Sequence, residues 1–323
     1  MMTRNKKKAL FMGTPDFAVP CLKKLCEMER LDVIGVVTQP DRPRGRGKKL
    51  TPSPVKECAA EKNIPVYQPE KVRTESFIEE LRKISPDIIV VVAFGQILPK
   101  DILDIPDFGC VNVHASLLPA YRGAAPMQRC IMNGELKTGV TTMMMDVGLD
   151  TGDILEQAEI DITRDMTLAE LSDKLSMMGA DLLVSTVNNL IDGKVTPKKQ
   201  DNSSVAENAR YSPMIDRETG HIDFSMSAKS IHDLCRALDS VPGAFASVNG
   251  EKHKIWKTIA LEDNPSCADK KNGEIISVSS DGIAVKTGRG IIEIKEIQAP
   301  GKKRMSAGDY LRGHSMTVGD VFV

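Results

Sequence analysis

The first part of the chain alternates between short apolar runs and segments with helical spacing. The apolar runs cover residues 8–12, 32–37, 87–93, 109–113 and 138–145, and the predicted helices between them cover 16–28, 54–62 and 74–84. A continuous apolar run such as 87–93 is typical of a strand that is covered on both faces. The alternation therefore predicts an α/β domain with a Rossmann-like, mostly parallel sheet and helices on both faces.

Capping patterns mark where several of the predicted helices begin. Candidate N-terminal capping residues are Ser53 before Pro54, Ser76 with Glu79, and Thr167 with Glu170. From Leu168 to Leu190 apolar residues recur at steps of three or four, which predicts one long amphipathic helix. Gly193 is a typical stop signal, so this helix is expected to close the first domain.

The C-terminal part of the chain has a different pattern. The polar stretch 194–212 is the best candidate for a linker. After a predicted helix at 228–238, short strands are joined by Asn249-Gly250 and Asp281-Gly282, dipeptides that favour hairpin turns. This pattern predicts a small β-barrel; an OB-like barrel fits, and other small barrels fit nearly as well. The expected division is 1–193 for a catalytic domain, 194–212 for a linker and 213–323 for the barrel.

Composition limits the class of protein. The chain has 323 residues, 41% of them hydrophobic and 27% charged, and a formal net charge of −1, so any contact with nucleic acid must be local. Its seven cysteines form no CxxC pair, which indicates reduced thiols rather than a zinc or disulfide framework. No run reaches the roughly 18 apolar residues of a membrane span. A cytoplasmic protein without a membrane partner is expected.

Three polar residues from two segments are candidates for catalysis. Asn112 and His114 lie two apart at the end of the strand 109–113, so their side chains share one face at the edge where open parallel sheets bind ligands. An amide donor beside a titratable ring suits a reaction in which a carbonyl oxygen becomes negative and a proton moves. Asp150, between Gly148 and Gly152, supplies an acidic partner. The alternative is that all three are structural, as strand-end groups and a turn aspartate.

The same segment resembles a known family. Asn112-x-His114-x-Ser116-Leu117-Leu118-Pro119, followed by Asp150, is similar to the signature of the folate-dependent formyltransferases. This resemblance implies transfer of a formyl group from 10-formyltetrahydrofolate to an amine, without a metal. It implies catalytic roles for Asn112, His114 and Asp150. It also implies a folate-binding segment made of Ser116, Leu117, Leu118 and Pro119.

A basic, glycine-containing segment follows the second predicted strand. It carries the cations Arg42, Arg44, Arg46, Lys48 and Lys49. With little apolar surface it is expected to be a free loop; such runs are usually solvated, but they can also neutralise phosphates. Together with residues 12–18 (MGTPDFA), this segment resembles the branch of the family that formylates methionyl-tRNA. The resemblance implies that the loop enters the acceptor stem of the initiator tRNA, that the OB-like domain contacts the tRNA, and that the protein is a monomer.

Two other functions stay open at this stage. A folate formyltransferase acting on a small amine, such as a nucleotide sugar or glycinamide ribonucleotide, would share the three catalytic candidates. The basic segment and the additional β-domain argue against it. A non-enzymatic RNA-binding module would explain those two features, but it would have no use for Asn112, His114 and Asp150.

Overall fold

The computed structural model describes residues 6–44, 49–203 and 205–323. The chain divides into two compact units. The first comprises Met1–Gly123, Lys137–Ile160 and Ser172–Tyr211, and the second comprises Ala124–Leu136, Asp161–Leu171 and Ser212–Val323. The division into 1–193, 194–212 and 213–323 stays a prediction.

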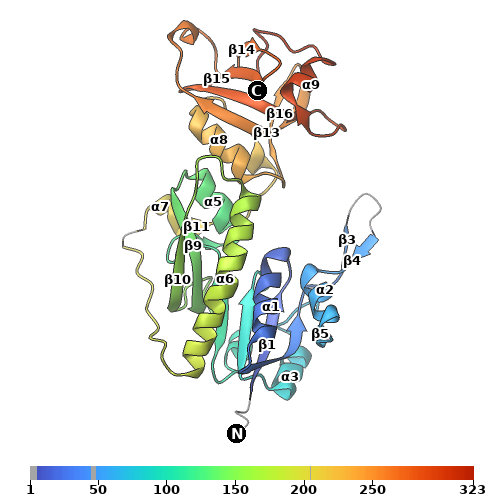
Figure 1. Ribbon diagram of the computed structural model, residues 1–323, viewed down its shortest axis with the longest axis vertical. Coiled ribbons are helices and arrows are strands. Elements are labelled where there is room, and N and C mark those ends of the chain that lie inside the picture. Colours follow the sequence, from blue (N-terminus) through green and yellow to red (C-terminus); the bar gives the residue numbers. More distant parts are fainter. Residues whose placement is uncertain (1–5, 45–48, 204) are drawn as a thin grey trace. The chain divides into compact units, whose positions relative to one another are not determined.

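The first unit is built on a mostly parallel sheet, as the sequence predicts. Among the described residues its strands follow the order β10-β9-β7-β6-β1-β2-β5 (Figure 1). Their bounds are β1 Lys7–Gly13, β2 Leu31–Val37, β5 Val66–Tyr67, β6 Ile88–Val92, β7 Cys110–His114, β9 Lys137–Met144 and β10 Ile154–Asp161. Strands β5, β2, β1, β6 and β7 run parallel, while β9 is antiparallel to β7. The parallel strands therefore end at one edge, where β7 delivers its last residues.

Helices cover both faces of this sheet. The helices that lie wholly or mostly in this unit are η1 Asp16–Ala18, α1 Val19–Glu27, α2 Pro54–Glu61, α3 Glu75–Ile84, α4 Lys100–Leu103, α6 Leu168–Ile191 and α7 Glu207–Arg210. On one face, Leu81 of α3 and Ile102 of α4 share a buried cluster with Leu10 of β1. On the other face, α6 packs so closely that a Cβ added at Gly179 would lie 3.0 Å from Val113 of β7. Figure 1 shows α1 and α6 on the nearer face.

Most of the predicted helix starts are confirmed. The hydroxyl of Ser53 accepts a hydrogen bond from the backbone amide of Lys56 at 3.1 Å. Thr167 and Glu170 form a capping box, since the Glu170 carboxylate accepts the Thr167 amide at 2.8 Å and the Thr167 hydroxyl accepts the Glu170 amide at 3.4 Å. The box predicted at Ser76 is wrong. The N-cap of α3 is Thr74, two residues before Ser76, so Ser76 already lies inside the first turn.

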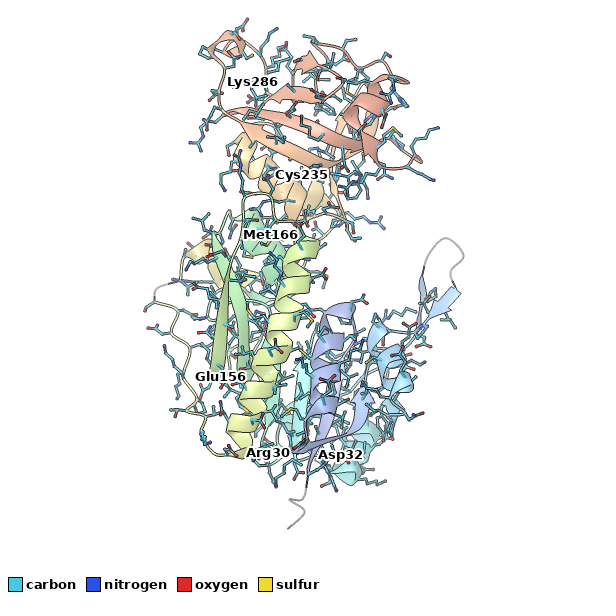
Figure 2. The ribbon with its side chains drawn as sticks, viewed as in Figure 1. Arg30, Asp32, Glu156, Met166, Cys235 and Lys286 are labelled. Carbon is cyan, nitrogen blue, oxygen red and sulfur yellow. The ribbon has the colours of Figure 1, made fainter. Side chains whose placement is uncertain are left out.

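A half-buried carboxylate fixes α6 against the sheet. Glu156 of β10, labelled in Figure 2, accepts hydrogen bonds from Thr186 Oγ1 and Asn189 Nδ2 of α6, both at 2.7 Å. These donors satisfy the carboxylate oxygens that packing removes from water. The long helix therefore keeps one register on β9 and β10.

The second unit contains an antiparallel β domain, in agreement with the prediction of a small C-terminal β structure. Its strands follow the order β12-β13-β16-β15-β14, with β17 beside β16. Their bounds are β12 Ala244–Val248, β13 Glu251–Leu261, β14 Ile275–Val278, β15 Ile283–Lys286, β16 Ile291–Gln298 and β17 Met305–Ser306. Its helices are α5 Pro126–Met132, η2 Glu218–Gly220, α8 Ala228–Ala237, η3 Pro265–Cys267 and α9 Ala307–Leu311. Asn249 and Gly250 both have positive φ, 52° and 77°, and make the predicted hairpin turn between β12 and β13.

In the part of the chain that the structure describes, no helix is both long enough and apolar enough to cross a membrane.

Candidate active site

Asn112 and His114 lie at the carboxyl end of β7. The strand is paired on both sides, with Val91 of β6 opposite Asn112 and Thr141 of β9 opposite His114. Both side chains are largely buried, with exposed fractions of 9% and 6%. Because β7 is a central strand, the two polar groups sit on a rigid backbone at the edge where ligands of α/β sheets bind.

Asp150 comes from the loop that follows β9. The loop is tight: the Asp146 carboxylate accepts the Thr151 hydroxyl at 2.7 Å, and a Cβ added at Gly152 would lie only 1.7 Å from the carbonyl oxygen of Met144. Gly152 is therefore required for the chain to pass its neighbour. Asp150 itself has a φ of 54°, in the left-handed region that few non-glycine residues occupy.

The three predicted catalytic residues converge. Asp150 Oδ2 lies 3.6 Å from His114 Nδ1, and Asn112 Nδ2 donates to Asp150 Oδ1 at 3.5 Å. A shorter bond, 2.9 Å, runs from the backbone amide of Gly123 to Asp150 Oδ2. The carboxylate is thus anchored by a backbone group, while its contacts with the amide and the ring are long and weak. The Asn112 amide can therefore exchange its long contact with Asp150 for a substrate oxygen with little loss.

The orientation of the His114 ring is set by a backbone carbonyl. Its Nε2 lies 2.9 Å from the carbonyl oxygen of Tyr121. A carbonyl only accepts, so Nε2 carries the proton of this hydrogen bond. Nδ1 is consequently the ring nitrogen that faces Asp150.

The predicted folate-binding segment is a turn held by internal hydrogen bonds. Leu118 donates its amide to Thr141 Oγ1 at 3.1 Å and accepts Gln157 Nε2 at its carbonyl at 2.9 Å. The Ser116 hydroxyl donates to the carbonyl of residue 120 at 2.7 Å. Ser116 and Leu118 are buried, whereas Leu117 and Pro119 are half-buried. The segment is thus preformed, with Leu117 and Pro119 as its more accessible side chains.

The basic segment is not wholly the free loop that the composition predicts. Strand β3 (Arg42–Arg44) pairs antiparallel with β4 (Lys49–Thr51), so its two ends form a short hairpin. Strand pairing orders the two ends of this segment even though the segment has little apolar surface to bury. Arg42 is exposed. Arg46 and Lys48 lie outside the described residues, as do the side chains of Arg44 and Lys49.

A polar cluster holds the base of this hairpin. Asp41 accepts Lys56 Nζ at 2.7 Å and Gln68 Nε2 at 2.8 Å. These hydrogen bonds, from Lys56 first and then Gln68, hold the pKa of the Asp41 carboxyl below its usual value. The Asp41 carboxylate, ionised and held by two hydrogen bonds, therefore fixes the base of the hairpin.

Sequence reasoning missed the groups that orient the site. Tyr121 and Gly123 act through backbone atoms, which have no side-chain signature. Gln200 lies in the polar stretch predicted as a linker, yet its amide donates to the carbonyls of Asp150 and Gly152 at 2.9 and 2.7 Å. The hydrophobic pattern likewise did not predict strands β8 (Arg122–Gly123) and β11 (Tyr211–Ser212).

Three buried thiols of the chain are poor nucleophiles. Burial raises the pKa of Cys110, on β7, to about 12, and it does the same for Cys21 and Cys235. None of these three is suited to form a covalent intermediate at neutral pH.

Alkylation of the folded protein tests this difference in reactivity. At pH 8 a thiol with a pKa of about 12 is a thiolate in about one molecule in ten thousand. We expect iodoacetamide to label the half-buried Cys267 well before Cys110, as read by peptide mass spectrometry. Denatured protein, in which all cysteines should react, is the control. Equal labelling of Cys110 and Cys267 in the folded protein would contradict the assignment.

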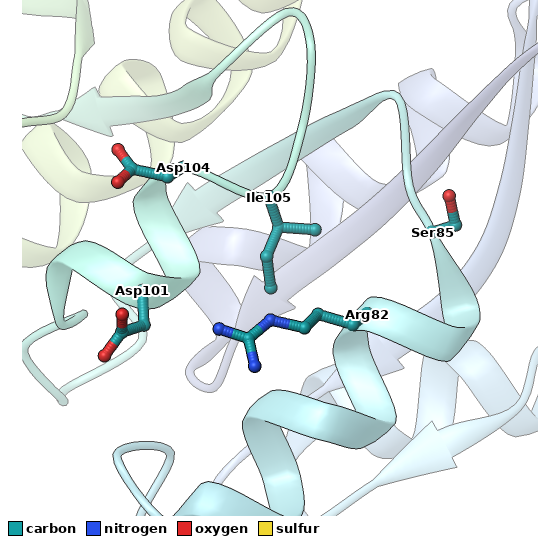
Figure 3. Close-up of a pocket in the computed structure, with 5 residues that line it drawn as sticks. All are labelled: Arg82, Ser85, Asp101, Asp104 and Ile105. Atoms are coloured by element: carbon teal, nitrogen blue, oxygen red, sulfur yellow. The ribbon is translucent and has the colours of Figure 1, made fainter.

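A cavity of about 370 Å³ lies between α3 and α4. Arg82, Ser85, Asp101, Asp104 and Ile105 line it, and Figure 3 shows the Arg82 side chain extending toward Ile105 and Asp101. The cavity shares no lining residue with the candidate site. Among the described residues no group of three or more His, Cys, Asp or Glu side chains could hold a metal ion.

The fold and the sequence together define the class of protein. Residues 6–187 match the formyl transferase family, and residues 214–315 match the formyl transferase C-terminal domain. The class is therefore that of the formyl-transferring enzymes. The chain is 51% identical to the methionyl-tRNA formyltransferase of Clostridium novyi (strain NT) over 315 residues, covering 97% of this chain and 99% of that protein. It is 50% identical to the one of Clostridioides difficile (strain 630) over 312 residues, covering 97% and 98%. The chain belongs to the methionyl-tRNA formyltransferase family.

Solved structures of more distant proteins share the fold. An N-formyltransferase from Helicobacter canadensis, in complex with folinic acid and dTDP-3-aminofucose, matches with a TM-score of 0.64 at 21% identity, over 90% of this chain and 99% of that one. HypX from Aquifex aeolicus, in complex with tetrahydrofolic acid, matches with a TM-score of 0.61 at 17% identity, over 95% of this chain and 47% of that one. At these identities the likeness is one of fold.

Proposed function

We propose that this protein transfers the formyl group of 10-formyltetrahydrofolate to the α-amine of initiator methionyl-tRNA, making the N-formylmethionyl-tRNA that starts translation. The observation that carries the proposal is the identity of about one residue in two to methionyl-tRNA formyltransferases along 97% of the chain. The convergence of Asn112, His114 and Asp150 supports it, because these groups suit attack on a carbonyl carbon. A cytoplasmic monomer fits this role.

The geometry supports a role for each residue in this reaction. The bound folate supplies a formyl carbon, which the amine attacks so that the formyl oxygen becomes negative. Asn112 Nδ2 and a protonated His114 Nδ1 donate to that oxygen, and both face the same side as Asp150. Asp150 balances the charge of the ring and accepts the proton that the amine loses, directly or through water. The negative oxygen then re-forms the carbonyl as the C–N bond to the folate breaks, and the departing nitrogen takes the proton that Asp150 accepted. No covalent enzyme intermediate is needed.

Each substrate has its proposed segment. Ser116, Leu117, Leu118 and Pro119 bind the folate, and because the Leu118 backbone groups already have partners, the contact is made chiefly by the half-buried Leu117 and Pro119. Residues 42–49, with Arg42, Arg44, Arg46, Lys48 and Lys49, contact the acceptor stem of the tRNA. The domain 213–323, with an OB-like barrel, contacts the tRNA, and 194–212 joins it to the catalytic domain 1–193.

A direct assay tests the reaction. Radiolabelled 10-formyltetrahydrofolate is incubated with the protein and either methionyl-tRNA, free methionine, an amino-sugar nucleotide or glycinamide ribonucleotide, and the reaction is quenched with acid. Label is expected on methionyl-tRNA alone. Label on a small amine, with none on methionyl-tRNA, would support the alternative of a small-amine formyltransferase.

The hairpin assignment makes a separate prediction. Arg42→Ala is expected to raise KM for the tRNA by about three- to tenfold and to reduce the slope of log KM against log salt by about one, because one phosphate contact is lost. KM for the folate should stay unchanged. Arg73→Ala, which removes an exposed cation elsewhere in the first unit, is the matched control. A rise in the folate KM instead would assign the hairpin to the cofactor site.

A further inference from the structure

One side chain from the predicted linker makes four hydrogen bonds beside the candidate active site. Gln200 Nε2 donates to the carbonyl of Asp150 at 2.9 Å and to that of Gly152 at 2.7 Å. Gln200 Oε1 accepts Arg122 Nε at 2.9 Å and Arg122 Nη2 at 2.6 Å. Both ends of the amide are therefore used.

The chemistry of these partners permits only one orientation of the amide. A guanidinium only donates, so the atom facing Arg122 is the oxygen of Gln200. Backbone carbonyls only accept, so the atom facing Asp150 and Gly152 is the nitrogen. A charged donor on one side and two acceptors on the other make this a polarised, directional clamp.

The clamp joins the two segments that orient the reacting groups. Arg122 lies between Tyr121, whose carbonyl holds His114 Nε2, and Gly123, whose amide holds the Asp150 carboxylate. On its other side Gln200 holds the backbone of Asp150 itself. Hydrogen bonds and the covalent segment 121–123 thus connect the ring, the carboxylate and Gln200.

The backbone of Asp150 needs such a support. Its φ of 54° lies in the left-handed region, which an aspartate occupies only when its surroundings compensate. The hydrogen bond from Gln200 to the Asp150 carbonyl stabilises this conformation. If the residue relaxed to a negative φ, its carboxylate would leave its place 3.6 Å from His114 Nδ1.

We infer that Gln200 is a positioning residue, which acts through Asp150 and the segment 121–123 to hold the carboxylate beside the His114 ring. The inference rests on the proposed function, because the effect is read through formyl transfer. It assigns to the stretch 194–212 a role in the reaction besides joining two domains. Gln200 touches neither the reacting atoms nor, by this assignment, either substrate.

The test compares Gln200→Met with Gln200→Glu and a control. Methionine keeps the length of the side chain and removes all four hydrogen bonds, whereas glutamate keeps the acceptor for Arg122 and loses the donor to Asp150 and Gly152. The control is Asn189→Leu, a substitution on α6 outside the candidate site. It removes the hydrogen bonds from Asn189 to Glu156 of β10 and to Ser185 of α6. Melting temperature, kcat, and KM for tRNA and folate are measured for each full-length protein. The His114 imidazole ¹⁵N shifts are recorded as a second readout.

Both Gln200 variants are expected to lose about ten- to a hundredfold in kcat, because a small misplacement of catalytic groups reduces rate strongly. Both KM values should change by less than about twofold, since no substrate contact is removed, and the His114 shifts should move. Asn189→Leu should lower the melting temperature without these changes. If Gln200→Met melts lower than the control, the comparison is made on Gln200→Glu. Folded Gln200 variants with the kcat and His114 shifts of the wild type would overturn the inference. Inactivity of the wild type on methionyl-tRNA would overturn the proposed function instead.

Discussion

Replacement of His114 by alanine is expected to lower kcat for methionyl-tRNA formylation by roughly a thousandfold. The substitution removes the proposed donor at Nδ1. It also removes the charged ring that, in the proposed mechanism, balances the negative charge of Asp150. The Asp150 carboxylate keeps its hydrogen bond from Gly123, so the loop should stay in place. Affinity for tRNA should be unchanged, because the proposed tRNA contacts lie in other segments.

Rapid-quench formylation and filter binding of the tRNA measure these two quantities. Val113→Ala is the control for a disturbed strand, since Val113 is buried on the same strand but points to the opposite face, toward α6. It should lose stability and keep most of its turnover. If His114→Ala turns over as fast as the wild type, His114 has no catalytic role.

Replacement of Asp150 by asparagine is expected to lower kcat by roughly a hundredfold or more. Asparagine has nearly the same size, tolerates positive φ, and can still accept the Gly123 amide through its remaining oxygen. What it lacks is the negative charge beside His114 Nδ1 and the capacity to take a proton. The loss of rate therefore measures the charge rather than the shape of the loop.

Asp146→Asn in the same loop is the matched control. Asp146 uses one oxygen to accept the amide of Gly148 and the hydroxyl of Thr151, and an asparagine oxygen can accept the same two groups. This variant should retain nearly full kcat and thermal stability. Equal rates for Asp150→Asn and the wild type would mean that the reaction does not use the carboxylate charge.

Local patterns were sufficient to predict the elements that carry the site. The run 109–113 predicts β7, found at Cys110–His114, and the run 138–145 predicts β9, found at Lys137–Met144. Such runs are informative because a strand covered by helices on both faces must be apolar along its length. The helix predicted at 74–84 is found at Glu75–Ile84, but the capping box predicted at Ser76 and Glu79 is wrong, because a Ser-x-x-Glu pattern occurs inside helices as well as at their ends.

The hairpin of β3 and β4 shows a limit of composition. Gly, Pro and cationic residues indicate a loop, and the middle of the segment, Arg46 and Lys48, lies outside the described residues. The pairing of Arg42 with Thr51 depends on the backbone and on the anchor at Asp41. Neither is visible in the hydrophobic pattern.

The sequence by itself determined the mostly parallel sheet, the C-terminal β unit, the family, and the identity of Asn112, His114 and Asp150 as candidates, because all of these are carried by side-chain type and local spacing. Only the tertiary structure decided how the three groups are held. The Tyr121 carbonyl, the Gly123 amide and the Gln200 side chain reach them from segments separated in the chain. Backbone donors and acceptors are the same in every residue, so their partners are set by folding and not by composition.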